Sequence, residues 1–104
     1  MTIKTQNQER AKFVLENLNI LGDSNYAQKI SSYIVANGLM PTLAFLQDKD
    51  KNNTYAFLKK YFEYKKYINV NEDPIEKLAN SDSTRLRIIT TEIMEIANWV
   101  RRLI

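Results

Sequence analysis

Glycine and proline, the residues that most often interrupt regular structure, are scarce in this chain. Its 104 residues include two Gly and two Pro. Sandwiches and barrels need many tight turns, so this scarcity argues against a protein built of strands and turns. The four residues, Gly22, Gly38, Pro41 and Pro74, also stand where runs of helical periodicity end or begin. The pattern predicts an all-α protein.

The stretch 37–49 joins two predicted helices directly. Gly38 most easily adopts the left-handed conformation that closes a helix, and Leu39 can then fold back onto Ile34. Pro41 has a fixed φ that suits the first turn of a helix, where its missing N–H is not needed. The apolar residues that follow give the second helix a face to bury. We therefore expect a helix end followed at once by a new helix start.

Apolar residues recur every three or four positions along most of the chain, as amphipathic helices require. The first helix is expected to bury a stripe that includes Val14, Leu15 and Leu18, and the last a seam from Leu86 to Leu103. Residues 49–53 are predicted to form a polar loop. Thr5 is predicted to cap the first helix and Asp23 or Ser24 the second. The predicted helices cover residues 5–21, 23–37, 41–48, 54–67, a short segment from 73, and 84 to near the C-terminus.

Length and composition limit the organisation of the chain. With 44% hydrophobic residues, 104 residues suffice for one globular domain, so we expect a single compact bundle of five to six helices over 1–104. The absence of Cys excludes a disulfide framework and favours an intracellular protein. No apolar run approaches the length of a bilayer, and the first eight residues lack the core of a secretory signal. A cytoplasmic protein without a membrane partner is predicted.

The chain also has no His, which restricts the chemistry open to it. Zinc sites of the usual kinds and Ser-His or Cys-His nucleophile pairs need His or Cys. An enzyme would rely on carboxylates, Lys, Tyr or a hard cation such as Mg²⁺. Glu92 and Glu95 are three residues apart but lack a third ligand, so a solvated face explains them. We expect no catalytic residue, metal, cofactor or small-molecule substrate; a carboxylate-dependent nuclease is the alternative enzyme.

The segment 59–67 carries the excess charge of the chain. The net charge is +3, and this segment alone contains four Lys and one Glu. Ammonium groups suit phosphates and aromatic faces suit bases, and the segment interleaves both kinds of residue. On a continuous helix, Lys59 and Lys66 would share a face. A solvated face whose lysine stems cover buried aromatic rings explains the same pattern. The candidate nucleic-acid-binding residues here are Lys59, Lys60, Lys65 and Lys66.

Three arginines complete the candidate set. Arg101 and Arg102 end the last helix, where cations complement the helix dipole by about 0.3–1 kcal/mol. That structural role is sufficient, although the planar guanidinium also binds phosphate or a neighbouring carboxylate. Arg10 and Lys12 are predicted on the outer side of the first helix. Trp99 flanks the seam of the last helix and is interpreted as a core or interface anchor rather than a base-stacking platform.

Several short pieces of the sequence carry a family resemblance in a consistent order. These pieces are residues 26–29, 37–39, 43–46 and 49, extended by 8–11, 91–92 and 99–102. In them the chain resembles the small subunit of the type III-B CRISPR effector, the Cmr complex. Pro41 departs from the pattern, because that family more often has a polar or small helix former there. The segment 69–83 adds nothing to the match.

The resemblance implies a non-catalytic subunit of an RNA-guided antiviral complex. Copies would stack head to tail into a minor filament beside the backbone subunit, and the partners would be those subunits, the guide RNA and the target RNA. The candidate cations would then position the RNA backbone. The equivalent subunit of a type III-A complex stays open on physical grounds. The alternatives are another helical protein-interaction module and a small DNA-binding regulator, although the helix predicted over 41–48 carries no cation to read a base.

Overall fold

The computed structural model describes residues 5–104, and these residues form helices and turns without a strand. The prediction of an all-α bundle of five to six helices is confirmed. Two short helical turns, the 3₁₀ turn η1 and the π-helical turn η2, accompany the six α-helices. The elements are α1 (Gln6–Leu21), η1 (Ala27–Lys29), α2 (Ile30–Asn37), α3 (Leu39–Lys49), η2 (Lys51–Tyr55), α4 (Ala56–Tyr64), α5 (Pro74–Ala79) and α6 (Ser83–Leu103).

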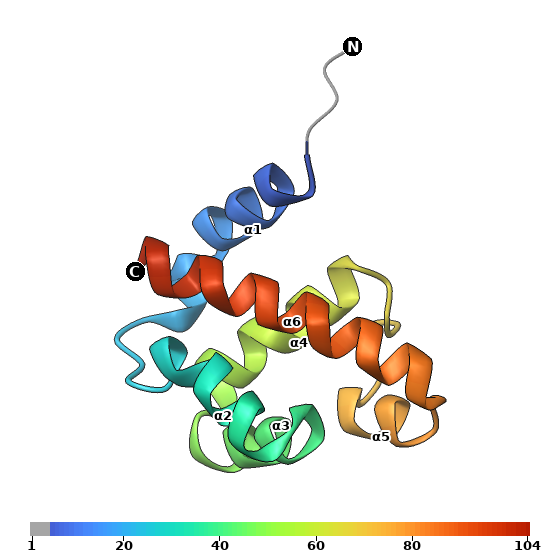
Figure 1. Ribbon diagram of the computed structural model, residues 1–104. Helices are drawn as coiled ribbons and strands as arrows, with labels where there is room; N and C mark the ends of the chain where they lie inside the picture. The colour runs from blue at the N-terminus through green and yellow to red at the C-terminus, as the bar shows by residue number, and fades with distance from the viewer. Residues whose placement is uncertain (1–4) are drawn as a thin grey trace.

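The long helix α6 organises the bundle. It has 21 residues and contacts α1, η1 and α2 along its length. In Figure 1, α6 crosses the front of the molecule with α4 behind it, α1 above, and α2, α3 and α5 below. The helix α1 also contacts α4, so these two helices and α6 pack together. The N-terminal half of α1, the C-terminal half of α4 and the middle of α6 therefore meet in one region.

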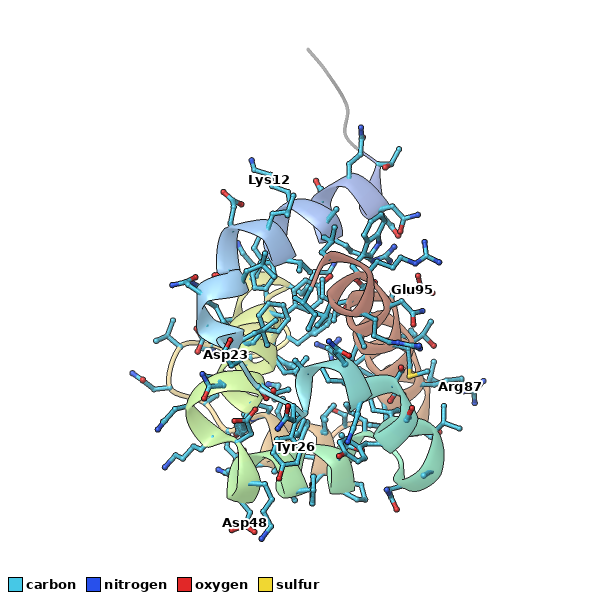
Figure 2. The ribbon with its side chains drawn as sticks, turned by 90° about the vertical axis from the view of Figure 1, so that its left-hand side faces the viewer. Lys12, Asp23, Tyr26, Asp48, Arg87 and Glu95 are labelled. Carbon is cyan, nitrogen blue, oxygen red and sulfur yellow. The ribbon has the colours of Figure 1, made fainter. Side chains whose placement is uncertain are left out.

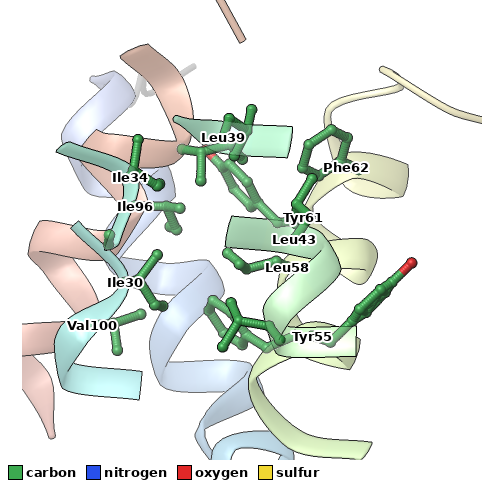
Figure 3. Close-up of a cluster of buried hydrophobic side chains, with 14 of the residues drawn as sticks. Ile30, Ile34, Leu39, Leu43, Tyr55, Leu58, Tyr61, Phe62, Ile96 and Val100 are labelled. Carbon is green, nitrogen blue, oxygen red and sulfur yellow. The ribbon is translucent and has the colours of Figure 1, made fainter. Parts of the chain in front are cut away.

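One hydrophobic cluster takes side chains from all six helices. The seam of α6 contributes Ile89, Ile93, Ile96 and Val100, all buried as their spacing predicts. Figure 3 shows Ile96 and Val100 facing the side chains of α2, with residues of α3 and α4 beyond them. The organisation of 1–104 as a single domain stays a prediction, and this shared core supports it.

The buried stripe of α1 differs from the predicted one. Thr5 caps the helix as expected, in a capping box with Gln8. Leu15, however, is 58% exposed, whereas Phe13 and Asn17 are buried. Phe13, Val14 and Asn17 share one face, and Leu15 lies about 100° further around the helix than Val14. The buried Asn17 amide donates to the Phe13 carbonyl at 2.8 Å, so its polar group is satisfied.

The chain between α1 and α2 also departs from the prediction. The second helix was expected to begin at Asp23 or Ser24, but α2 begins at Ile30, after η1. The Ser24 hydroxyl donates to the Asp50 carboxylate and lies 2.9 Å from Thr54 Oγ1. It also accepts from the backbone N–H of Tyr26. Ser24 therefore ties this connection to the α3–α4 junction instead of capping a helix.

The predicted polar loop at 49–53 is helical. Asp50 accepts from the backbone N–H of Thr54 at 3.0 Å and caps η2, which leads directly into α4. The Asn53 amide donates to the Ile20 carbonyl at 2.8 Å, so the end of α1 stabilises this turn. At its other end α4 stops at Tyr64, three residues earlier than predicted. Lys66 then takes a positive φ of 60°, which ends the helical path.

Gly38 separates α2 from α3 where the sequence predicts a break, but α3 begins before Pro41 and the ψ of Gly38 is that of an extended rather than a left-handed helical backbone. Its φ is 87° and its ψ 167°, and its N–H donates to the Ile34 carbonyl at 2.7 Å. Leu39 follows, 3% exposed, and begins α3 two residues before Pro41. Only glycine adopts this backbone conformation readily. The sharp connection lets α2 and α3 pack against each other.

Gly38→Ala is expected to lower the free energy of unfolding by about 1–3 kcal/mol, because a Cβ is strained at this backbone conformation. The cost is conformational: the nearest atom to an added Cβ would be Cδ of Pro41 at 3.8 Å, an ordinary contact. Urea unfolding followed by circular dichroism measures the change. Ser32→Ala, exposed on α2, is the control and should change little. An unfolding midpoint equal to that of the control would contradict the role of Gly38.

Candidate nucleic-acid interface

The candidate lysines lie at the C-terminal end of α4 and just beyond it. Tyr61 and Phe62 are buried, 1% and 0% exposed, and anchor this end of the helix in the core as predicted. Lys60 and Lys66 are exposed, and Lys59 and Lys65 are half-buried. The interpretation that Lys59 and Lys66 share a helix face is wrong, because α4 ends at Tyr64. The four lysines form a short cationic segment, called here the lysine segment.

No carboxylate of the described residues forms an ion pair with the lysine segment, although the charge of Lys65 helps to lower the pKa of Glu92. Among residues 5–104, ion pairs within 4.0 Å join only Arg10 to Glu92 and Lys49 to Asp48. The ammonium groups of Lys59, Lys60, Lys65 and Lys66 are thus not paired within the described chain. Unpaired ammonium groups held at a fixed helix end are free to bind phosphate.

Aromatic rings flank the lysine segment, and the ring of Tyr64 is open to solvent. Tyr64 is 50% exposed, and its ring stacks on that of Tyr61 with centroids 5.9 Å apart. It also contacts Phe13 of α1, at 5.1 Å between centroids. The ring of Tyr67 packs edge-on against Phe62 at 5.8 Å. The predicted interleaving of cations and aromatic groups is therefore present in space, but mainly through Tyr64.

Arg10 is placed differently from the prediction. Its side chain is only 12% exposed, so the expectation that Arg10 lies on the outer side of the first helix is wrong. Its Nη2 donates to Glu92 Oε1 at 2.7 Å and its Nε to Glu92 Oε2 at 2.8 Å, a two-point ion pair between α1 and α6. The hydrogen bond to Glu92 raises the pKa of Arg10 further above its ordinary value. Lys12, by contrast, points away from α1 into solvent as expected (Figure 2).

Glu92 is the centre of a polar cluster that sequence reasoning missed. The Tyr61 hydroxyl of α4 donates to Glu92 Oε2 at 2.5 Å, so this carboxylate joins three helices. Burial alone would raise the pKa of Glu92, but the hydrogen bonds from Arg10 and Tyr61 outweigh it and leave that pKa below its ordinary value. Burial and the bond to Glu92 raise the pKa of Tyr61. No spacing in the sequence relates position 10 to position 92.

Arg101 and Arg102 form a second cationic group, called here the arginine pair. Both are exposed in the last turn of α6, and neither forms an ion pair with the described residues. The Arg102 guanidinium carbon lies 6.0 Å from the centroid of the Trp99 ring. Ten residues of helix, about 15 Å, separate Arg102 from Glu92 along α6. The arginine pair is thus separated from Glu92 along α6. Arg10 lies between the two regions, because its Nη1 donates to Asn7 Oδ1 at 2.9 Å, the same oxygen that the Trp99 Nε1–H faces at 3.4 Å.

Neither a metal centre nor a membrane span is found in the described part of the chain. No three His, Cys, Asp or Glu side chains in residues 5–104 gather where they could hold a metal ion. Glu92, one of the two carboxylates considered from sequence, is engaged by Arg10 and Tyr61. None of the helices over these residues has the length and apolar character that crossing a bilayer requires.

Comparison with known families identifies the chain. The family described as CRISPR-associated protein (Cas_Cmr5) matches residues 6–104. The chain belongs to this family. Members of the Cmr5 family are the small subunit of the type III-B Cmr complex, so the resemblance stated from the sequence is confirmed. Searches of curated proteins and of solved structures found no match. The Cmr5 match spans all six helices, the lysine segment and the arginine pair.

Proposed function

We propose that this Cmr5-family protein is a non-catalytic subunit that helps hold target RNA along the guide RNA of a cytoplasmic type III-B effector in antiviral defence. Copies of it would stack head to tail into a minor filament beside the backbone subunit. The observation that carries the RNA contact is the unpaired state of Lys59, Lys60, Lys65 and Lys66 at the anchored end of α4. The arginine pair supplies a second unpaired cationic group.

The chemistry of such a contact is electrostatic. Ammonium groups that neutralise phosphates release counterions, and this gain does not depend on base sequence. Contacts to phosphate position a strand, whereas pairing with a guide reads its bases. Arg10 contributes indirectly, because its ion pair with Glu92 fixes α1 and α6 beside the end of α4.

Repetition along a filament compensates for weak single contacts. A head-to-tail interface repeats the same surface in each copy, so an RNA strand that follows the filament meets several lysine segments. Once one copy is bound, the next contact forms at a high effective concentration. Weak RNA binding by the isolated subunit is compatible with a strong effect in the assembled complex.

A sequence-reading DNA regulator fits the structure poorly. The helix that would follow the turn at Gly38 is α3, and it buries Leu39, Thr42, Leu43 and Leu46. Its one cation, Lys49, lies in the last turn and pairs with Asp48 at 3.5 Å. A recognition helix needs an exposed polar face toward the groove. The RNA-guided complex is therefore the better-supported role.

Changing Lys59, Lys60, Lys65 and Lys66 together to Glu is expected to weaken target-RNA binding by the reconstituted complex and to flatten its salt dependence. Each lost phosphate contact to a single strand should reduce the logarithmic salt slope by about 0.7. Filter binding or fluorescence anisotropy over a salt series measures both quantities, and circular dichroism verifies that the variant folds.

A charge-matched control separates this local effect from a change in net charge. It replaces four exposed lysines elsewhere by Glu, and it should retain most of the binding. If both variants bound target RNA as well as the unmodified complex does, the assignment of the lysine segment would be refuted. If both variants lost the same affinity, the loss would come from the change in net charge and not from these four positions. The control positions are Lys12, Lys29, Lys51 and Lys77.

A further inference from the structure

Two hollows adjoin on the surface where the end of α6 passes the start of α1. The first has a volume of about 190 Å³ and a mainly polar lining that also includes one indole ring. The second is lined by Asn98 and the arginine pair. The hollows share Asn98 and Arg102, so they form one continuous depression. The first hollow is lined by Asn7, Glu95, Asn98, Trp99 and Arg102.

The indole ring is held in place at the wall of the first hollow. Trp99 is half-buried and packs against the core, and its Nε1–H points at Asn7 Oδ1, 3.4 Å away. The Arg102 guanidinium lies 6.0 Å from the ring centroid. The guanidinium lies over the ring, so a nucleobase on this face would stack on the indole in place of Arg102. Bases stack on aromatic rings and on guanidinium planes alike.

Polar groups surround this platform. The Asn98 amide can both donate and accept hydrogen bonds, and the Glu95 carboxylate accepts them. The Asn7 amide is left to donate, because its oxygen already accepts from Arg10 Nη1 at 2.9 Å and from Trp99 Nε1 at 3.4 Å. Figure 2 shows Glu95 on the outer side of α6, away from the core. A carboxylate favours a base edge with an amino group, as in cytosine, adenine or guanine, over the edge of uracil. It also repels a phosphate, which restricts the phosphate to the second hollow.

The second hollow carries positive charge, which suits the phosphate that Glu95 repels. Arg101 and Arg102 are exposed and form no ion pair with a carboxylate in the described chain. A guanidinium group can bind a phosphate through two parallel hydrogen bonds. A base in the first hollow would therefore have its own or the next phosphate beside these two arginines.

We infer that this depression binds one unpaired nucleotide of a single-stranded nucleic acid, with the base against Trp99 and the phosphate at the arginine pair. The inference rests on the proposed function for the source of the strand, which is RNA. It goes beyond that function because it adds a contact to a base where the lysine segment offers only contacts to phosphate.

The single tryptophan of the chain permits a direct test. The full-length protein, labelled with ¹⁵N, is titrated in low salt with short single-stranded RNA, with DNA of the same sequence, and with an abasic strand of the same length. We expect the indole N–H resonance and the side-chain amides of Asn7 and Asn98 to shift with strands that carry bases and not with the abasic strand. Oligocytidine should shift them at lower concentration than oligouridine.

Variants locate the contact. Asn98→Ala, at an exposed position, should weaken the binding reported by the indole resonance about three- to tenfold. Asn52→Ala, at an exposed position distant in sequence from the residues that line the hollow, should leave this binding unchanged. Glu95→Gln should reduce the preference for cytidine over uridine, a change that a purely structural role for Glu95 would not produce.

The possible outcomes separate this inference from the proposed function. Shifts at the backbone amides of the lysine segment without an indole shift would overturn the nucleotide pocket and leave the proposed function standing. An indole shift with the lysine segment unaffected would support the pocket and count against the assigned RNA face. Equal indole shifts with the abasic strand would overturn the base contact. A shift with RNA and not with DNA would identify the ribose hydroxyl as a further contact, and equal shifts would show that base and phosphate suffice for binding.

Discussion

Glu92→Leu is expected to lower the free energy of unfolding by about 2–3 kcal/mol, because it leaves the Arg10 guanidinium and the Tyr61 hydroxyl without their shared acceptor. Breaking a buried pair by removing one partner typically costs about 3–5 kcal/mol. Arg10 and Glu92 are each 12% exposed, and Arg10 keeps contacts to Asn7 and Gln6, so a value at or below the lower end applies. Denaturant unfolding measures the loss.

Two control variants show that the cost arises from unpaired groups. The triple variant Arg10→Met, Tyr61→Phe and Glu92→Leu removes all three polar partners and should recover most of the lost stability, since apolar replacement of a buried pair is often neutral. Asp48→Asn breaks the ion pair with Lys49, whose side chains are 74% and 54% exposed, and should cost under about 0.5 kcal/mol. A loss from Glu92→Leu no larger than that from Asp48→Asn would contradict the structural role of the cluster.

The contribution of Glu92 also depends on pH in a definite direction. Its pKa is lowered in the folded protein, so the unfolded chain binds this proton more readily than the folded chain does. The stabilisation is complete above the ordinary value of 4.5 and is lost as the pH falls through the lower folded-state pKa. The difference in stability between the unmodified protein and Glu92→Leu should therefore shrink as the solution is acidified below that range. A difference that grows on acidification would contradict this assignment.

Phe57→Ala is expected to cost more, about 3–5 kcal/mol, because it creates a cavity in the centre of the core. Phe57 is fully buried on α4, and its ring meets that of Phe13 edge-on with centroids 5.4 Å apart. A small domain has a total stability of about 5–15 kcal/mol, so this variant should be close to unfolding at moderate temperature. Thermal and urea unfolding followed by circular dichroism measure the loss.

Phe45 offers a matched control of the same residue type. It lies on α3, is 38% exposed, and contacts the rings of Tyr26 and Tyr33 at the surface. Phe45→Ala leaves little cavity, because solvent already reaches the site, and should cost about 1 kcal/mol from the lost ring contacts. If the two variants were equally unstable, burial on α4 would not be what stabilises the bundle.

The candidate site shows where sequence reasoning stops. Lys60 and Lys66 could be assigned to solvent from composition and charge, and both are exposed. The environment of Arg10 could not be assigned in this way, because the local sequence around an arginine near a helix start is the same whether its side chain faces water or a partner. Its partner, Glu92, was interpreted from the sequence as a solvated residue, and only the crossing of α1 and α6 brings the two side chains within 2.7 Å.

The sequence by itself determined the features that depend on a few neighbouring residues. Helical periodicity, the cap at Thr5, the break at Gly38 and the start at Pro74 all follow from interactions within about one helical turn, and all four are present. The buried seam of α6 follows from the same local periodicity. These features suffice for the fold class, because each helix must bury its apolar face against the others.

The tertiary structure decided everything that joins distant positions. The π-helical turn at 51–55 is stabilised by the hydrogen bond of Asn53 to Ile20 of α1 and by that of Ser24, in the connection after α1, to Asp50. The hollow beside Trp99 exists because α1 places Asn7 there. Hydrogen bonds and ion pairs between residues far apart in the chain depend on how helices cross. The crossing is set by the packing of the whole core, which no local pattern encodes.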